Sequence, residues 1–337
     1  MSGLELWHYL LWPFVACLVL AGIHCYLGLH VVSRGVIFVD LALAQLAFLG
    51  TATAATIAHY VAEPLRSVPA NAPPRSEAPP SGEIESLEDI DRLLEAQAKP
   101  VPQAGNVSPG PSRAAYGWWP YLGGIGFTLV GAAVFAACRG RTGQVPQEAI
   151  IGIVYAVGAA LTVILIYKSP IDALEQTEAM LVGRILFVHK VDVLHAALVY
   201  AAVAGVHLMC WKPFRVLSFA PAEEASLGRG ARWWDFVFYA TFGFVVSSSV
   251  QIAGVLLVFS FLVVPAVASM LVTTGLLRRL LLGWALGVAA SVLGLLISVW
   301  LDAPTGASVV VAFALLLLAT ATLARWRLQR MGTGAGS

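Results

Sequence analysis

The feature that most constrains this chain is a series of apolar runs, each long enough to cross a lipid bilayer as a helix. A membrane-spanning helix needs roughly 20 predominantly apolar residues. We predict eight or nine such spans, at about 8–32, 36–61, 117–138, 145–167, 191–211, 233–248, 250–275, 279–300 and 305–325. The sixth and seventh candidates meet at residues 247–251, where either a bend or a full loop separates them.

The composition excludes several classes of protein. Charged residues make up only 12% of the chain, its hydrophobic residues make up 59%, and its mean hydropathy is +0.81. Soluble domains carry about 25% charged residues, so a soluble enzyme, a disordered protein and a nucleic-acid binder are all excluded. The chain is predicted to be an all-α polytopic membrane protein.

The distribution of lysine and arginine predicts the topology. If the N-terminus lies outside and the chain alternates, twelve bases fall inside and three fall in short outside segments. Cytoplasmic loops are enriched in Lys and Arg, so we expect the N-terminus outside, the C-terminus inside and an odd number of crossings. The segment 172–190 is too charged to span and is expected to be a short surface or re-entrant helix.

A short cytoplasmic segment at residues 218–228 has the signals of a helix between two spans. Pro221 sits early, Glu223 and Glu224 occupy the first turn, and Gly228 ends it. Proline and acids favour helix N-termini, and glycine favours the position after the C-terminus. A compact helix at this place is suited to docking a soluble subunit.

Four stretches, taken in order, carry a family resemblance. They are GLHVVSR at 28–34 leading into DLALAQLAFLG at 40–50, QEAIIGIVYA at 147–156, residues 217–228 followed by 254–266, and LDAPTGA at 301–307. The chain resembles the permease subunit of the zinc/manganese/iron ABC importers. Residues 1–61 and 117–325 would then form one permease domain, joined by a Pro-rich extracytoplasmic loop at 62–116 and followed by a cytoplasmic tail at 326–337. That loop is either a solvated linker or a docking element for an extracytoplasmic partner.

The resemblance implies a transport subunit of the bacterial plasma (inner) membrane. It implies a second permease subunit (a homodimer), separate cytoplasmic ATP-binding subunits, an extracytoplasmic metal-binding protein, and a divalent metal ion as transported substrate with no permanently bound cofactor. The chain has no GxxxxGK[ST] loop, so it is not itself the ATPase. The segment 218–228 matches the coupling helix of the family, and the resemblance assigns ATPase coupling to Ser218, Phe219, Pro221, Glu223, Glu224, Leu227 and Gly228.

The chain departs from the family at the metal ligands. The second helix of the family carries an Asp-x-x-x-His pair, and the matching positions here are Leu41 and Gln45. We expect His24 and Asp40 to take over ligation, because imidazole and carboxylate suit zinc, iron or manganese. Gln45 would supply an amide oxygen or hold a water, and His30 is a further candidate ligand.

Depth arithmetic places the four candidates in two layers of the membrane. At 1.5 Å per residue from the turn at Arg34, His24 lies roughly 15 Å deep and Gln45 roughly 16 Å deep. By the same arithmetic, His30 and Asp40 share a shallower layer near the cytoplasmic side. The alternatives are that His24 only donates a hydrogen bond to a backbone carbonyl and that His30 sits at the headgroups.

Two further acids have open roles. Glu148 is either an inner-gate contact or a first-turn helix charge. Asp302 is either a ligand or, as we expect, a structural cap for the next helix.

Other functions stay open at this point. The transported substrate could be a chelated metal or a small organic cofactor. An autonomous ion-coupled carrier would need internal repeats or broken helices around buried charge. An intramembrane protease would need a histidine near Ser247–Ser249, and neither of the predicted spans that meet there, 233–248 and 250–275, contains one.

Overall fold

A computed structural model describes residues 3–66, 118–139, 146–168, 185–228 and 230–334. In these residues the chain is helical and has no strand. The α-helices are α1 (Gly3–Arg34), α2 (Val39–Arg66), α4 (Trp119–Cys138), α5 (Gln147–Lys168), α7 (Lys190–Met209), α8 (Trp211–Phe219), α9 (Gly230–Ala253), α10 (Val255–Val272), α11 (Leu276–Leu301) and α12 (Thr305–Gly334). Two 3₁₀ helices, η2 (Ile185–Phe187) and η3 (Pro221–Leu227), lie before α7 and after α8.

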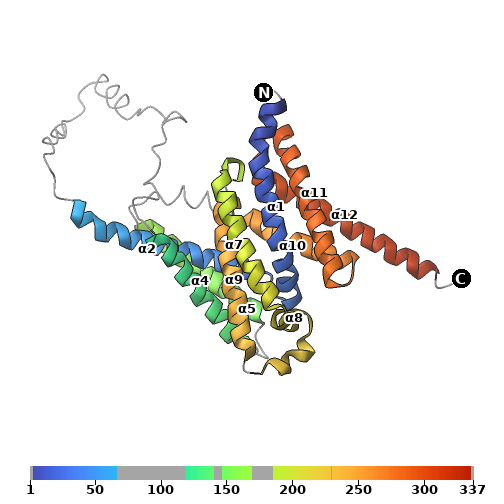
Figure 1. Ribbon diagram of the computed structural model, residues 1–337, viewed down its shortest axis with the longest axis horizontal. Helices are drawn as coiled ribbons and strands as arrows, with labels where there is room; N and C mark the ends of the chain where they lie inside the picture. Colours follow the sequence, from blue (N-terminus) through green and yellow to red (C-terminus); the bar gives the residue numbers. More distant parts are fainter. Residues whose placement is uncertain (1–2, 67–117, 140–145, 169–184, 229, 335–337) are drawn as a thin grey trace, which may run out of the picture.

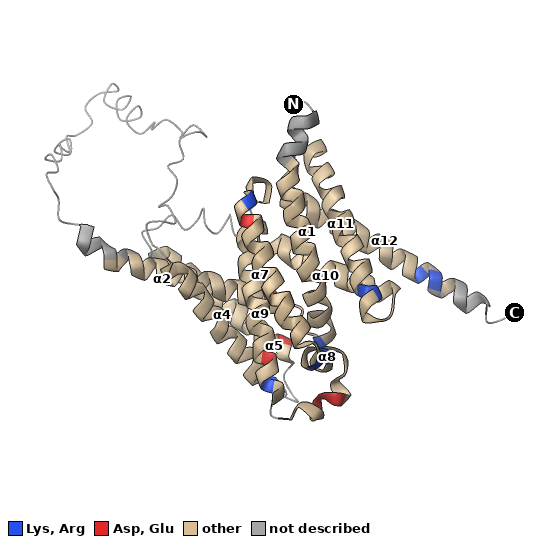
Figure 2. Cartoon of the chain, in the orientation of Figure 1, with Lys and Arg blue, Asp and Glu red and all other residues tan. Residues whose placement is uncertain are grey.

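Nine helices in the described ranges are long and apolar enough to cross a membrane. Each corresponds to a predicted span, so the all-α multi-pass fold is confirmed and the count of eight or nine resolves to nine for this part of the chain. Lys, Arg, Asp and Glu gather near helix ends, mostly toward the end of the bundle that carries α8, and long central stretches are uncharged (Figure 2). Apolar side chains therefore face the lipid over most of the bundle.

The helices form two packed groups (Figure 1). In one, α1 packs on α10 and α11, and α12 packs on α10 and α11. In the other, α2 packs on α4 and α5, and α4 packs on α9. The two groups meet where α9 contacts α10 and where α7 contacts both α1 and α9. The ends of α1, α4, α8 and α9 converge at the α8 end of the bundle.

Glycine allows the closest approach between α2 and α4. A Cβ at Gly50 would lie 2.3 Å from the carbonyl oxygen of Gly123, and a Cβ at Gly123 would lie 2.3 Å from that of Gly50. No side chain fits at either position without moving a backbone. Small residues at such crossings let membrane helices pack closely, and this contact sets the position of α2.

Three sequence-based boundaries need correction. The break between α9 and α10 is not at 247–251 but at Gly254, whose φ of +78° lets the chain turn within one residue. The coupling helix is divided, because α8 ends at Phe219 and η3 begins at Pro221. The last helix continues through most of the predicted tail, to Gly334. The predicted loop at 62–116 and the segment at 172–190 lie largely outside the described residues.

Candidate functional site

The turn between α1 and α2 is tied to the start of α5. Gly35 has a φ of +68°, a conformation that glycine adopts without steric cost, and Val36 N donates to Val31 O at 3.2 Å. Glu148, in the first turn of α5, accepts a hydrogen bond from Ile37 N at 3.1 Å. Glu148 therefore holds α5 against this turn, at the first-turn position expected from the sequence.

The coupling segment, residues 218–228, lies at the same end of the bundle. Pro221 is the first residue of η3, where a missing N–H costs no hydrogen bond, and Gly228 ends it with a φ of +51°. No residue of η3 is buried. Glu223 pairs with Arg215 of α8 at 3.2 Å. Gly228 thus ends the segment as expected, although the helix begins at Pro221 rather than at Ser218, and η3 presents acidic residues at the surface.

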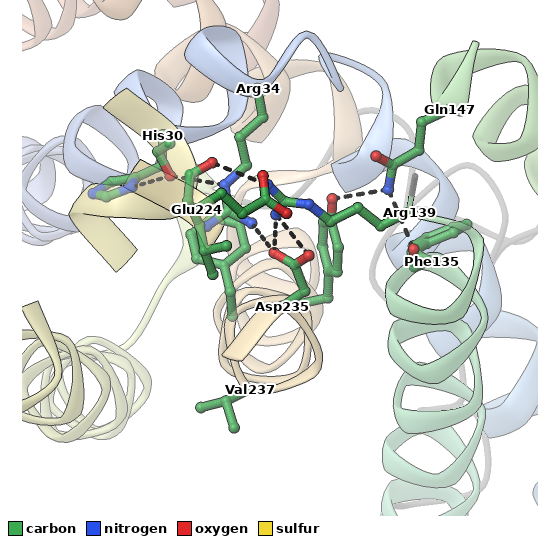
Figure 3. A network of polar contacts seen from close by, with 12 residues as sticks. His30, Arg34, Phe135, Arg139, Gln147, Glu224, Asp235 and Val237 are labelled. Atoms are coloured by element: carbon green, nitrogen blue, oxygen red, sulfur yellow. Dashed lines mark hydrogen bonds and ion pairs between the residues drawn. The ribbon is translucent and has the colours of Figure 1, made fainter. Parts of the chain in front are cut away.

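A buried aspartate organises the helix ends beneath this segment (Figure 3). Asp235 of α9, whose side chain is 0% exposed, accepts from Arg34 Nη1 at 2.9 Å. It also accepts from Arg139 Nη1, at 2.5 Å to Oδ1 and 2.6 Å to Oδ2. Arg139 Nη2 donates to Glu224 Oε2 of η3 at 3.0 Å. These four charged residues, hereafter the Asp235 network, join α1, α9, η3 and the residue that follows α4.

The network continues into α8. Arg34 Nε donates to Ser218 Oγ at 2.7 Å, and the same oxygen shares a 2.7 Å hydrogen bond with His30 Nδ1. The Arg34 guanidinium lies 3.8 Å from the centroid of the Phe238 ring, a favourable cation–π position. Ser218 is thus a buried anchor of the coupling segment, and His30 is engaged in this network.

Arg139 stays cationic in this environment. Burial disfavours its charged form, but the hydrogen bonds and charges of Asp235 and Glu224 outweigh that effect and raise the pKa of Arg139 above its ordinary value. A neighbouring contact between helices is made by an uncharged side chain. Gln147 Nε2 donates to Phe135 O at 3.2 Å and to Tyr239 OH at 3.1 Å. It joins the start of α5 to α4 and α9.

His24 lies deep in the bundle and is fully buried. Its Nδ1 donates to Leu20 O at 2.9 Å, so the backbone hydrogen bond expected as an alternative is present. Its Nε2 has no hydrogen-bond partner in the described structure. The Tyr200 ring meets the imidazole edge-on, with centroids 6.0 Å apart, and Tyr200 OH shares a 2.5 Å hydrogen bond with Ser249 Oγ.

The two polar candidates on α2 differ in their contacts. Asp40 is 2% exposed, and its Oδ1 has no hydrogen-bond partner among the described residues. Gln45 Nε2 donates to Thr162 Oγ1 at 2.8 Å, and that hydroxyl donates to Gly158 O at 2.8 Å. Gln45 therefore joins α2 to α5, whereas Asp40 keeps a buried acceptor available.

The histidine and aspartate candidates do not form a three-ligand cluster among the described residues. Across the described ranges, no group of three His, Cys, Asp or Glu side chains lies close enough together to hold a metal ion. The helix of His24, α1, packs on α7, α8, α10 and α11, whereas the helix of Asp40, α2, packs chiefly on α4, α5 and α9. A shared depth along the membrane normal does not place two side chains beside each other.

Asp302 caps the helix before it rather than the helix after it. It occupies the C-cap of α11 with a φ of +50°, a left-handed conformation that Asp tolerates better than most residues. Ser298 Oγ donates to Ala303 O at 2.8 Å across the same turn. The expected cap of α12 is therefore corrected to a cap of α11.

The sequence analysis missed the Asp235 network. One signal was available, because an acidic residue within an apolar span is a functional candidate, and Asp235 lies near the start of the predicted span at 233–248. The pairing itself has no sequence signal. Arg34 lies 201 positions from Asp235 and Arg139 lies 96 positions from it, and no motif spacing connects them.

The arrangement of helices has counterparts in known proteins. Residues 114–324, more than half of the chain, match the family described as "ABC 3 transport family". The chain belongs to the ABC 3 transport family. The match runs from α4 into α12 and includes the coupling segment, Arg139 and Asp235.

Two bacterial membrane transport proteins align with this chain over most of their own length. The chelated iron transport system membrane protein YfeC of Yersinia pestis is 24% identical over 213 residues, which cover 63% of this chain and 72% of that protein. The manganese import system permease protein ScaB of Streptococcus gordonii is 28% identical over 200 residues, which cover 59% of this chain and 70% of that protein.

A solved structure has the same fold. It is described as PsaBC from Streptococcus pneumoniae in complex with Fab, and it is 19% identical to this chain with a TM-score of 0.64. The alignment covers 95% of this chain and 93% of that one. The nine apolar helices of the described ranges are therefore arranged as in a solved structure that matches nearly the whole chain.

Proposed function

We propose that this chain is the transmembrane permease subunit of an ABC importer for a divalent transition metal ion: manganese, iron or zinc. Membership of the ABC 3 transport family supports the transport role. The names of the relatives, a manganese import permease and a chelated iron transport membrane protein, support the cargo. ATP is hydrolysed on separate subunits, and this chain performs no covalent chemistry.

The observation that carries this proposal is the coupling segment. It lies at one end of the bundle, its η3 part has no buried residue, and its Ser218 end is buried against α1. An ATPase subunit needs such an exposed element that is anchored to the helices it must move. Alternating access would follow from small rotations of the packed helices when the ATPases close.

The orientation and partners follow from this role. The N-terminus lies outside and the C-terminus inside, which places the coupling segment in the cytosol, in agreement with the bias of Lys and Arg. The membrane is the inner membrane of a bacterium, because the relatives named above are bacterial. Two copies of the chain form the pathway, and an extracytoplasmic binding protein delivers the metal.

Asp40 and His24 are the residues we propose to contact the cargo. Each retains a buried polar atom without a hydrogen-bond partner, Oδ1 and Nε2 respectively. Buried polar groups are normally satisfied, and an exception calls for an explanation such as a ligand. Gln45 and His30 are hydrogen-bonded to protein groups, so we assign them to positioning α2 and the coupling segment.

The test is transport by the purified complex. The tagged chain is expressed with its ATPase subunit, purified in detergent and reconstituted into liposomes. We expect ATP-dependent uptake of radioactive Mn²⁺, Fe²⁺ or Zn²⁺, with competition among the three reporting the preferred ion. A chain that does not copurify with an ATPase, or a complex that moves none of these ions with ATP, contradicts the proposal.

A chelated metal is the second candidate cargo. The name of the Yersinia relative favours it, as does the presence of Leu41 and Gln45 where the family resemblance implies a ligand pair. The same liposomes distinguish the two cargoes. Uptake of iron only as a siderophore-type chelate, with none of the free ion, would assign the chelate.

A further inference from the structure

The two arginines of the Asp235 network each have two separate arms. Arg34 donates through Nη1 to Asp235 and through Nε to Ser218. Arg139 donates through Nη1 to Asp235 and through Nη2 to Glu224 and, at 3.4 Å, to Leu217 O. One arm of each guanidinium therefore holds the bundle at α9, and the other holds α8 or η3 (Figure 3).

Exposure increases from the centre of this network outward. The side chains of Asp235, Arg34, Arg139 and Glu224 are 0%, 4%, 19% and 37% exposed, respectively. Exposed ion pairs contribute little, whereas removing one partner of a buried pair leaves an uncompensated charge. The Asp235 end is therefore the fixed part of the network, and the Arg139–Glu224 contact is the part that can open or move.

The network also joins elements that come from distant parts of the sequence. Arg34 ends α1, Arg139 is the C-cap residue of α4, and Asp235 lies near the start of α9. Two arginines and two acids balance in formal charge. A shift of η3 acts on Arg139, and because both guanidinium groups share Asp235, the ends of these three helices respond together.

We propose that Arg139, held by Asp235, is the positioning residue that links the coupling segment mechanically to the helix bundle. This inference rests on the proposed function, since it specifies how movement of an ATPase on η3 reaches α1, α4 and α9. Arg139 does not contact the cargo. Its role is to make transport follow ATP hydrolysis, so its loss should change the amount of metal moved for each ATP consumed.

Lysine and glutamine substitutions separate this role from simple folding. Arg139→Lys keeps a charge for Asp235, but an ammonium group lacks the planar fork that reaches two acceptors in different directions. Glu224→Gln removes the other charge of the same contact at a partly exposed position, where the fold tolerates change. Arg215→Lys is the matched control, because Arg215 forms the separate exposed pair with Glu223.

The experiment measures Mn²⁺ uptake and ATP hydrolysis together in liposomes that contain the whole complex. We expect Arg139→Lys and Glu224→Gln each to lower the Mn²⁺ moved per ATP at least about threefold, and the double variant to equal either single one, because both break one contact. Arg215→Lys should keep the wild-type ratio.

Three results would overturn the inference. The first is a ratio of Mn²⁺ moved per ATP in Glu224→Gln that equals the ratio in Arg215→Lys. This result overturns the inference even if Arg139→Lys fails to assemble. A double variant whose loss multiplies those of the singles does so as well, because the two residues would then act independently. Loss of ATPase copurification in Glu224→Gln would assign this residue to docking instead. A wild-type complex that takes up none of Mn²⁺, Fe²⁺ and Zn²⁺ with ATP would instead contradict the proposed function itself.

Discussion

Two buried aspartates, Asp235 near the start of α9 and Asp40 near the start of α2, have opposite environments. Asp235 receives hydrogen bonds on both oxygens from two arginines. Asp40 is equally enclosed, yet its Oδ1 has no partner in the described structure. A buried carboxylate whose oxygens both accept hydrogen bonds from the protein stabilises the structure. A buried carboxylate oxygen without a hydrogen-bond partner is available to bind a transported cation. The first region would therefore transmit movement, and the second would contact cargo.

The sharpest way to break this comparison is to neutralise Asp235. Asp235→Asn leaves Arg34 and Arg139 buried without their shared counter-charge, and we expect a loss of about 3–5 kcal/mol in the free energy of unfolding. Denaturant unfolding of the purified chain in detergent measures it. Asp192→Asn is the control, because Asp192 lies in the first turn of α7 with its side chain 46% exposed and should cost at most about 1 kcal/mol. Equal losses would show that Asp235 is not the centre of a structural network.

Neutralising Asp40 should have the opposite profile. Asp40→Asn keeps the shape of the side chain, and we expect the unfolding free energy to change by no more than about 1 kcal/mol, the range of a first-turn helix charge. Uptake of Mn²⁺ should fall at least about tenfold, as for the loss of a group that sets metal affinity. Initial uptake rates in liposomes provide the measurement. Unchanged uptake in both Asp40→Asn and Asp40→Ala would remove Asp40 from the cargo path.

Replacing His24 sharpens the same point with a smaller effect. His24→Phe keeps a flat ring beside Tyr200 but removes Nε2, and we expect uptake to fall about threefold because one nitrogen ligand is lost from the path. Tyr200→Phe removes only the hydroxyl bonded to Ser249 and should leave uptake unchanged. If the two variants lose uptake equally, His24 acts through packing of this cluster rather than through its nitrogen.

The smallest expected effect is at Gln45. Gln45→Leu loses the hydrogen bond to Thr162 between α2 and α5, and interhelical hydrogen bonds in membranes average about 0.6 kcal/mol. Thr162→Val removes the other partner, so a double-mutant cycle on unfolding free energy isolates the pair. A coupling energy near zero would mean that the contact does not position α2.

Much of the fold could be predicted because the bilayer restricts what an apolar run can do. A spanning segment must satisfy its own backbone hydrogen bonds, so run length located the apolar helices of the described ranges and left open only whether there are eight or nine. Gly228 likewise predicted where η3 ends, because it acts on the backbone of its own residue, whereas the single helix expected over 218–228 is divided between Phe219 and Pro221. The break between α9 and α10 was predicted at the polar serine run, residues 247–249. The glycine that makes the turn, Gly254, was missed because a single glycine within an apolar stretch is a weaker signal than three consecutive serines.

The site was only partly predictable, for a related reason. The same depth argument that grouped His24 with Gln45 measured position along the membrane normal and carried no information about which helices are neighbours. It therefore could not reveal that Gln45 bonds Thr162, nor that His30 bonds Ser218. From the sequence, Arg34 served as a depth reference and Arg139 was only one of the bases counted for the topology.

The sequence by itself determined that this chain crosses the membrane many times and carries an acidic, exposed segment between two spans, because hydropathy and backbone signals are local properties. Only the tertiary structure decided which charges meet. Asp235, Arg34 and Arg139 lie far apart along the chain, and their pairing depends on how α1, α4 and α9 pack, which no single segment encodes. The same packing left Asp40 Oδ1 and His24 Nε2 without hydrogen-bond partners among the described residues, whereas both oxygens of Asp235 accept hydrogen bonds from arginine.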